Sequence, residues 1–419
     1  MFLVKFKIVK KLIGFFLQQK IFIFINVLVL CAKIFYSSLN GFEGLTFEDW
    51  NIANNLAKYN VYSEYISLGP TAYKLPLYPI LLSIFIKIFG DHAMAAVFIF
   101  QHFVYFFIPL LIISISKIFD KPMIGLVTSY LFILSPAYFF YSNTLEITNV
   151  FIIIFLNFLF WFLLIWEKGS SSRRSVILAI STTLLFLTQV IAVPFSIVLL
   201  FSLLIFKKVK LKQFFFIICT VGALYSPWVI RNYVVFDKVI IAKTPVWQNI
   251  HFGYFSEVQI FKSLQKIPFE KGEEIKRRRS KTDEFTMETF YKKEVKEFEK
   301  NDPYISVRKA FANALMLWYV PSRYFYDNSL SILIGRKIYV IVINIVSILA
   351  MIEMYKRRHL FLLIFTLVLF ANFTLPYMIG HAAMTRFKLD FEWYQLFLIA
   401  YFIYFKTKRN LYLTKTMTL

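Results

Sequence analysis

The chain has 419 residues, of which 59% are hydrophobic and only 17% are charged, and its mean hydropathy is +0.64. This balance lies outside the range of soluble globular domains and predicts an integral membrane protein. The net charge of +23 does not indicate a nucleic-acid partner, because the basic residues fall mostly at the ends of apolar runs, where they meet lipid headgroups. We therefore expect membrane lipid as a partner and no nucleic acid.

Taken in chain order, the apolar runs predict about ten membrane-spanning helices. They lie near residues 21–37, 95–116, 122–142, 147–166, 175–190, 191–206, 213–229, 338–354, 360–379 and 391–405. A further apolar run, 76–90, is short, and we expect a re-entrant or interfacial helix there, with a short span as the alternative. The predicted fold class is all-α: a polytopic membrane protein with about 10–12 transmembrane helices in a single domain, 1–419.

The orientation of these helices follows from the basic clusters between them. Clusters at 173–174, 207–212, 356–358 and 406–409 share one side of the membrane with the basic N-terminus. The positive-inside rule then predicts a multi-pass protein of the inner (plasma) membrane with both termini in the cytoplasm. No small-residue cleavage site follows the N-terminal lysines, so we expect an uncleaved first span.

Two segments then face away from the cytoplasm, and both are expected to form short interfacial helices. They are a first outer loop, 38–75, and a long outer loop, 230–337. The run Arg277-Arg278-Arg279 in the long outer loop is interpreted as a solvated helix face. Cys31 and Cys219 lie inside apolar runs, and the five histidines lack ligand spacing, so we expect no metal site of protein ligands.

Two acids follow the first predicted span closely. A carboxylate near the hydrocarbon boundary is costly unless it is hydrated, paired or used, so Glu48 and Asp49 are candidates for a catalytic base. The alternative is structural, because acids also stabilise the first turn of a helix, here one beginning near Phe47. Glu146, at the outer mouth of a later span, is a candidate for positioning an acceptor or a metal, with a boundary acid as the alternative.

Three cations are predicted on the outer face against the positive-inside bias: Arg231, Arg386 and Lys388. Binding of a phosphate gives such cations a function, and Arg can grip a phosphate with two parallel hydrogen bonds. Lys74, which precedes the run Leu75 to Pro79, is a further candidate for phosphate binding. Anchoring to lipid headgroups is the alternative for each of them.

Three motifs together resemble a known enzyme family. The first is Phe47-Glu48 with Ile52-Ala53 and Leu56, followed by Gly69-Pro70-Thr71-Ala72-Tyr73 and Pro76-Leu77-Tyr78-Pro79; the second is Pro227-Trp228-Val229-Ile230-Arg231-Asn232-Tyr233; the third is Thr385-Arg386-Phe387-Lys388. In this order they resemble motifs of the GT-C superfamily of membrane glycosyltransferases. More narrowly, they resemble the bacterial members of glycosyltransferase family 39, which are related to protein mannosyltransferases and lipid A aminoarabinose transferases.

The resemblance implies an inverting transfer of a sugar from a polyprenyl-phosphate donor to an extracytoplasmic acceptor, which is a lipid, a glycan or a protein. Such an enzyme needs a base for the acceptor proton and cations for the leaving phosphate. Glu48 occupies the position of the base in the resemblance, and Asp49 is the second choice. The lipid-linked sugar is then the donor substrate, and a divalent metal stays an option.

A transporter or flippase of lipid-linked sugars is the alternative function. It predicts inverted repeats and Gly/Pro-broken helices in matching halves, which the sequence does not show. A non-catalytic scaffold is a third hypothesis, and it leaves Glu48, Arg231 and Arg386 without a role. Only the enzyme hypothesis requires these residues to converge on one outward cavity.

Overall fold

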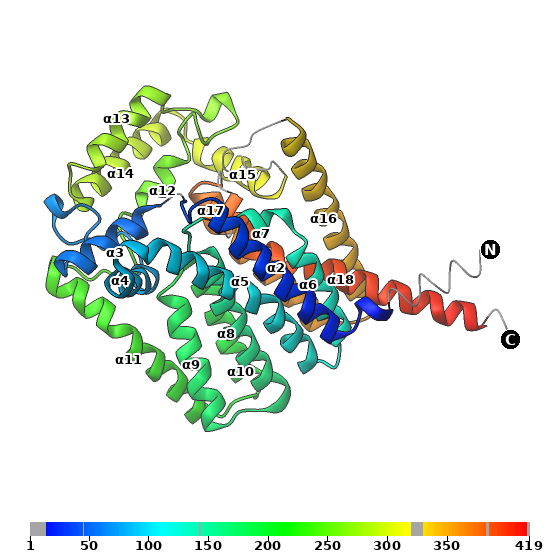
Figure 1. The fold of residues 1–419 in the computed structure, drawn as a ribbon. Coiled ribbons are helices and arrows are strands. Elements are labelled where there is room, and N and C mark those ends of the chain that lie inside the picture. The colour runs from blue at the N-terminus through cyan, green and yellow to red at the C-terminus, as the bar shows by residue number, and fades with distance from the viewer. Residues whose placement is uncertain (1–13, 45, 142–143, 320–329, 383–384, 417–419) are drawn as a thin grey trace.

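A computed structural model describes residues 14–44, 46–141, 144–319, 330–382 and 385–416, and its fold is drawn in Figure 1. These ranges are mainly helical, and a single bridge between Phe255 and Ile267 does not extend into a strand. The predicted all-α class is therefore confirmed. The N-terminal lysines up to Lys11, and residues 320–329 of the predicted long outer loop, lie outside the described ranges.

The helices follow the predicted apolar runs closely. The first part of the chain forms α2 (Gln19–Leu39), α3 (Glu48–Tyr59), α4 (Leu77–Phe89), α5 (Ala93–Ile118), α6 (Pro122–Ile133), α7 (Pro136–Tyr141), α8 (Thr148–Lys168), α9 (Ser172–Phe186) and α10 (Val193–Ile205). The second part forms α11 (Leu211–Phe236), α12 (Trp247–Phe252), α13 (Phe269–Arg279), α14 (Glu284–Asn301), α15 (Ile305–Trp318), α16 (Leu330–Lys356), α17 (Leu360–Ile379) and α18 (Thr385–Thr416).

Six helical runs among the described residues are long and apolar enough to cross a membrane. They are α2, the run from α4 through α5, α8, α11, the part of α16 from Ile334, and α17. Helices α6 and α10 are apolar but shorter, with 12 and 13 residues. The long apolar helices confirm a polytopic membrane protein.

The predicted span 122–142 is divided into two helices. Helix α6 ends at Ile133, and α7 begins at Pro136. The residue before a proline is sterically disfavoured in the helical conformation, which interrupts the helix at Ser135. Run 76–90 forms α4, whose 13 residues extend only about 20 Å, less than the roughly 30 Å of a bilayer core.

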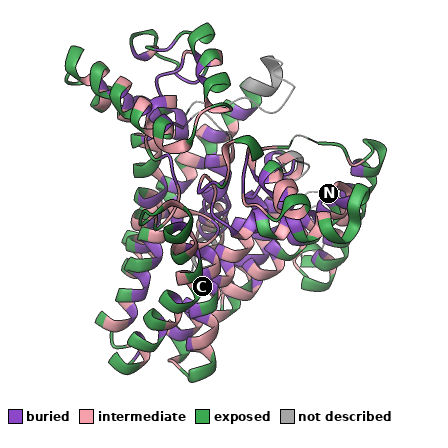
Figure 2. Ribbon diagram, turned by 90° about the vertical axis from the view of Figure 1, so that its left-hand side faces the viewer, coloured by how far each residue is buried: buried purple, intermediate pink, exposed green. Residues whose placement is uncertain are grey.

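Helix α8 lies inside the bundle and contacts α5, α9, α10 and α18. Phe151, Phe155, Phe158 and Phe162 are fully buried on it, and their rings stack in sequence with centroids 5.7, 6.4 and 6.4 Å apart. Spacings of three and four residues place these rings on one helix face, and Figure 2 shows the buried residues gathered inside the bundle. This packing fixes α8, which begins two residues after Glu146.

Helices α12 to α15 form a separate layer at one end of the bundle, as Figure 1 shows. They have their own core, which includes Tyr254, Met287 and Val295. The layer contacts the turn between α17 and α18 closely: Asn313 donates a hydrogen bond to the Gly380 carbonyl at 2.9 Å. The long loop therefore folds back onto the end of the bundle where α18 begins.

Candidate functional site

Glu48 and Asp49 occupy the first turn of α3, where the exposed N–H groups favour acids. Lys74 Nζ lies 3.4 Å from Glu48 Oε2 and 3.4 Å from Asp49 Oδ2, so the two carboxylates share one ammonium group. The Asp49 side chain is only 8% exposed, whereas that of Glu48 is 30% exposed. Glu48 is therefore the more accessible of the two acids.

The loop that carries Lys74 is held by hydrogen bonds from two helices of the second half of the chain, α11 and α14. Arg231 donates to the carbonyls of Thr71 at 2.8 Å and Tyr62 at 3.3 Å. Glu284 of α14 accepts hydrogen bonds from the Thr71 hydroxyl at 2.5 Å and the Ala72 N–H at 3.0 Å. Arg231 thus contacts backbone carbonyls of the first loop, which positions Lys74 beside the acids.

Arg279, the last residue of α13, brings the long loop to the same place. Its guanidinium forms an ion pair with Glu64, lies 4.0 Å from Glu48 Oε1 and sits 4.2 Å above the Tyr73 ring. The prediction that the whole arginine run is a solvated face is therefore wrong for Arg279. Arg277 and Arg278 do point outward as exposed residues.

Arg386 and Glu146 form a further ion pair near Glu48, Asp49, Lys74 and Arg279, and these six residues, together with Lys243, are called the charged cluster. Arg386 Nη1 donates to Glu146 Oε2 at 2.6 Å, and the Glu146 side chain is 7% exposed. The pair joins the start of α18 to the segment before α8. Arg386 also acts electrostatically on Glu48 and Lys74, although it forms no direct ion pair with either residue.

Lys243 is the cation of this cluster that sequence reasoning missed. It lies on the segment between α11 and α12 and forms no ion pair with any described residue. Its pKa is raised by the charges of Asp49 and Glu48 and lowered by those of Lys74 and Arg386. Burial, together with the positive charges of Lys74 and Arg386, lowers the pKa of Lys243 from 10.5 to about 8. The ammonium group of Lys243 is therefore available to bind a ligand anion.

The charges around Glu48 outweigh the effect of its burial. Burial alone raises the pKa of Glu48, but Lys74, its own backbone N–H, Arg279 and Arg386 together lower it from 4.5 to about 2. For Lys74, burial acts to lower the pKa, while Asp49 and Glu48 raise it above its ordinary value. Glu48 and Lys74 are therefore both charged near neutral pH.

His381 is buried beside the cluster, where its ring packs on Phe252 and Phe387. Burial, and then the charges of Arg386, Lys309 and Lys243, lower its pKa to about 3, so the imidazole is neutral near pH 7. No motif marks His381, Lys243 or Arg279 in the sequence. Arg279 and Lys243 come near the acids because their segments fold against the first loop, and His381 lies near Arg386 and Lys243.

Lys388 does not join the other predicted site residues. Its Nζ lies 4.1 Å from the Trp318 ring centroid and 4.8 Å from that of Phe391, and it has no hydrogen-bond partner among the described residues. Residues two apart on a helix point in nearly opposite directions. Lys388 therefore faces α15 while Arg386, on the same helix, faces Glu146.

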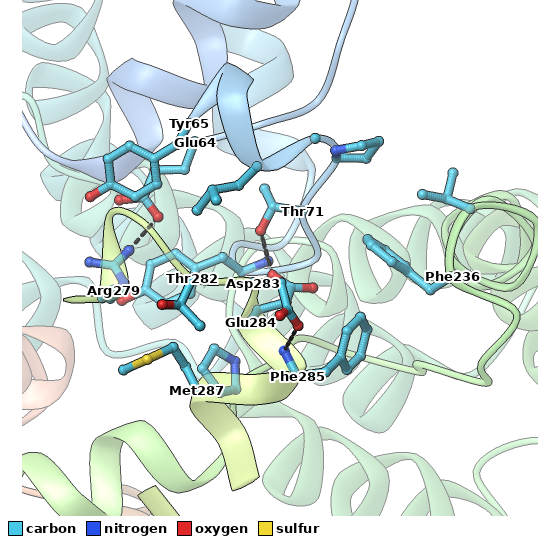
Figure 3. A pocket seen from close by; sticks show the side chains of 16 residues that line it. Glu64, Tyr65, Thr71, Phe236, Arg279, Thr282, Asp283, Glu284, Phe285 and Met287 are labelled. Atoms are coloured by element: carbon cyan, nitrogen blue, oxygen red, sulfur yellow. Dashed lines mark hydrogen bonds and ion pairs between the residues drawn. The ribbon is translucent and has the colours of Figure 1, made fainter. Parts of the chain in front are cut away.

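A cavity of about 260 Å³ lies beside Arg279, between residues 64–73 and helices α13 and α14. Figure 3 shows Glu64 and Arg279 facing each other on one side, with Thr71 and Glu284 on another. Since Arg279 contacts this cavity and also lies 4.0 Å from Glu48, the cavity and the charged cluster adjoin. Its wall combines hydroxyl, carboxylate and aromatic groups, which suit a polar ligand.

Across the described ranges, no three His, Cys, Asp or Glu residues are arranged to hold a metal ion. Comparison with protein-family models, with curated proteins and with solved structures finds no match to this chain. The function must therefore be argued from the geometry of the cluster.

Proposed function

We propose that this protein is a membrane glycosyltransferase of the GT-C type, which moves a sugar from a polyprenyl-phosphate donor to an extracytoplasmic acceptor. One observation carries the proposal: Glu48 and Asp49 share Lys74, while Lys243 beside them has no ion-pair partner among the described residues. The cluster thus offers both an accessible carboxylate and an available cation. Sugar transfer from a phosphate donor requires these two groups together.

Glu48 is the base in this proposal because its side chain is more exposed than that of Asp49. It takes the proton of the acceptor hydroxyl or amine as the acceptor atom bonds to C1 of the sugar. The bond from C1 to the phosphate oxygen breaks on the opposite face, so the configuration at C1 inverts. The phosphate leaves as an anion and needs no proton, so a single carboxylate is sufficient, unlike the pair of a glycosidase.

Lys243 and Arg386 hold the leaving phosphate in this scheme. Arg386 is fixed through Nη1 by Glu146, and its Nε has no hydrogen-bond partner among the described residues. Lys74 lowers the pKa of Glu48 and, through its contacts with Glu48 and Asp49, holds both acids in place. Arg231 acts through the loop that it supports, and Lys388 has no part in the scheme because it faces Trp318.

The cavity beside Arg279 is the proposed acceptor site. It adjoins Glu48 through Arg279, and hydroxyl and carboxylate groups of Thr71, Glu64 and Glu284 line it. An acceptor seated there presents its nucleophile to Glu48. The two termini of this multi-pass protein are then cytoplasmic, and the cluster faces outward from the inner membrane.

Transfer of label from polyprenyl-phosphate sugars, measured in membranes that contain the chain, tests the proposal. Glu48→Gln preserves shape and removes the base, so transfer should fall about 10²–10⁴-fold at similar donor KM. Asp49→Asn should be milder, because an acid that only supports a helix start contributes roughly 0.5–2 kcal/mol to stability. Glu43→Gln is the matched control, since Glu43 is an exposed acid of the same loop.

Near-normal transfer by the Glu48→Gln protein would remove Glu48 from the mechanism, and an inactive Asp49→Asn protein beside it would assign the base to Asp49. Movement of intact lipid-linked sugar across the membrane, with no transfer, would favour a flippase instead. Loss of transfer in Glu43→Gln would show that the assay reports damage to the loop.

A further inference from the structure

A second cavity lies at the end of the bundle away from Glu48. Its volume is about 410 Å³, within the range of about 300–1,000 Å³ typical of ligand pockets. Its walls come from the end of α5, the start of α6, the middle of α8, the first turns of α17 and the part of α18 from Trp393 to Phe405. Helix α17 has 20 residues, so about 30 Å separates its first residue, at the Arg358 side of this cavity, from its last residue, near the start of α18 and Arg386.

The walls and the mouth of this cavity differ in character. Leu156, Leu159, Phe365 and Trp393 are among the apolar side chains that line its interior. Lys121 and Arg358 stand at the helix termini that border it. No carboxylate lines it, and neither of these cations forms an ion pair with a described residue.

The backbone around Arg358 adds to this observation. Arg358 has a φ of +58°, a left-handed conformation that glycine adopts without cost and other residues do not. His359, next along the chain, lies 2.6 Å from the Tyr401 hydroxyl, which fixes the turn against α18. The turn therefore holds a charged side chain at the mouth of an apolar cavity.

We propose that this cavity binds a phospholipid with an anionic headgroup: an acyl chain lies among the helices, and Lys121 and Arg358 contact the phosphate. Charge complementarity selects this occupant. An apolar cavity of a membrane protein is open to any acyl chain, but two uncompensated cations at its mouth favour a negative head. The site is separate from the proposed transfer reaction, so its failure and the failure of that reaction can be told apart.

The test is native mass spectrometry of the full chain extracted from nanodiscs of phosphatidylcholine with phosphatidylglycerol. The wild-type protein should retain phosphatidylglycerol in preference to phosphatidylcholine. Lys121→Gln/Arg358→Gln should lower that retention about 25-fold, because each cation that contacts the bound phosphate contributes about fivefold to binding of an anionic lipid. Arg173→Gln/Lys212→Gln is the control, since both residues are exposed cations near the starts of α9 and α11, at the same end of the bundle.

A second variant tests the apolar part of the site without changing charge. Ile115 lines the cavity and is only partly buried, so Ile115→Trp should fill the space and displace the lipid while the cations remain. Equal retention of the two lipids by the wild-type protein would overturn the proposal. Unchanged retention in both site variants, equal losses in the control variant, or retention of detergent alone would overturn it as well.

Discussion

Lys243 gives the sharpest prediction about the charged cluster, because its charge should change within an accessible pH range. Burial, and the neighbouring charges of Lys74 and Arg386, lower the pKa of Lys243 to about 8. The charged fraction then falls from about 90% at pH 7 to about 10% at pH 9. If the ammonium group binds the donor phosphate, this binding is present below pH 8 and is lost as the pH rises through it.

The expected result is a donor KM that rises about tenfold between pH 7 and pH 9. Glu48 adds no limb in this range, since its pKa of about 2 keeps it ionised throughout. The assay is the initial rate of sugar transfer against donor concentration at pH values from about 6.5 to 9.5, chosen to bracket the titration.

Two substitutions distinguish titration of Lys243 from other causes of a pH-dependent donor KM. Lys243→Arg keeps the cation charged across this range, so the donor KM should become independent of pH. Lys238→Arg is the control, because Lys238 is an exposed lysine of the same segment whose Nζ lies 3.8 Å from the Phe285 ring centroid. A limb that is identical in the wild-type and Lys243→Arg proteins would refute the assignment of Lys243.

Two further predictions concern stability and the assignment of cations. Arg386→Gln should lower the free energy of unfolding by about 3–5 kcal/mol, because it leaves Glu146 buried without its partner; Arg386→Gln/Glu146→Gln should recover part of that loss in a thermal unfolding measurement. Lys388→Met should keep the melting temperature or raise it, because Nζ is buried without a hydrogen-bond partner among the described residues. The donor KM of the Lys388→Met protein should not change, and a several-fold increase would show that Lys388 takes part in phosphate binding.

The helices could be predicted from the sequence because a membrane span needs a long apolar run, and such runs are visible locally. The break at Ser135 also had a local signal, since Pro136 follows it. The acids and Lys74 could be found because a charge near a membrane boundary is unusual. The sequence did not show that Glu48 and Asp49 both pair with Lys74, because this contact depends on the loop between α3 and α4 turning back toward the start of α3.

The other half of the cluster could not be predicted in this way. Arg279 and Lys243 belong to a long polar segment in which many residues are charged, so no single cation stands out. Which of them faces Glu48 depends on how α13 packs against the first loop. Lys388 shows the converse: the Thr-Arg-Phe-Lys motif suggested one site for two cations, but the helix separates Arg386 and Lys388 onto different faces.

The pairing within the cluster explains how one small volume can hold both a base and an anion site. Arg386 is neutralised by Glu146, and Arg279 is neutralised by Glu64. Lys74 pairs with two carboxylates, so these three residues together carry a net charge of −1 when all are charged. Lys243 supplies the matching positive charge without contacting either acid. If Lys243 moved into contact with Glu48, a carboxylate would occupy its ammonium group, which would no longer be available to the phosphate. Their separation in the fold is therefore the feature that the proposed reaction depends on.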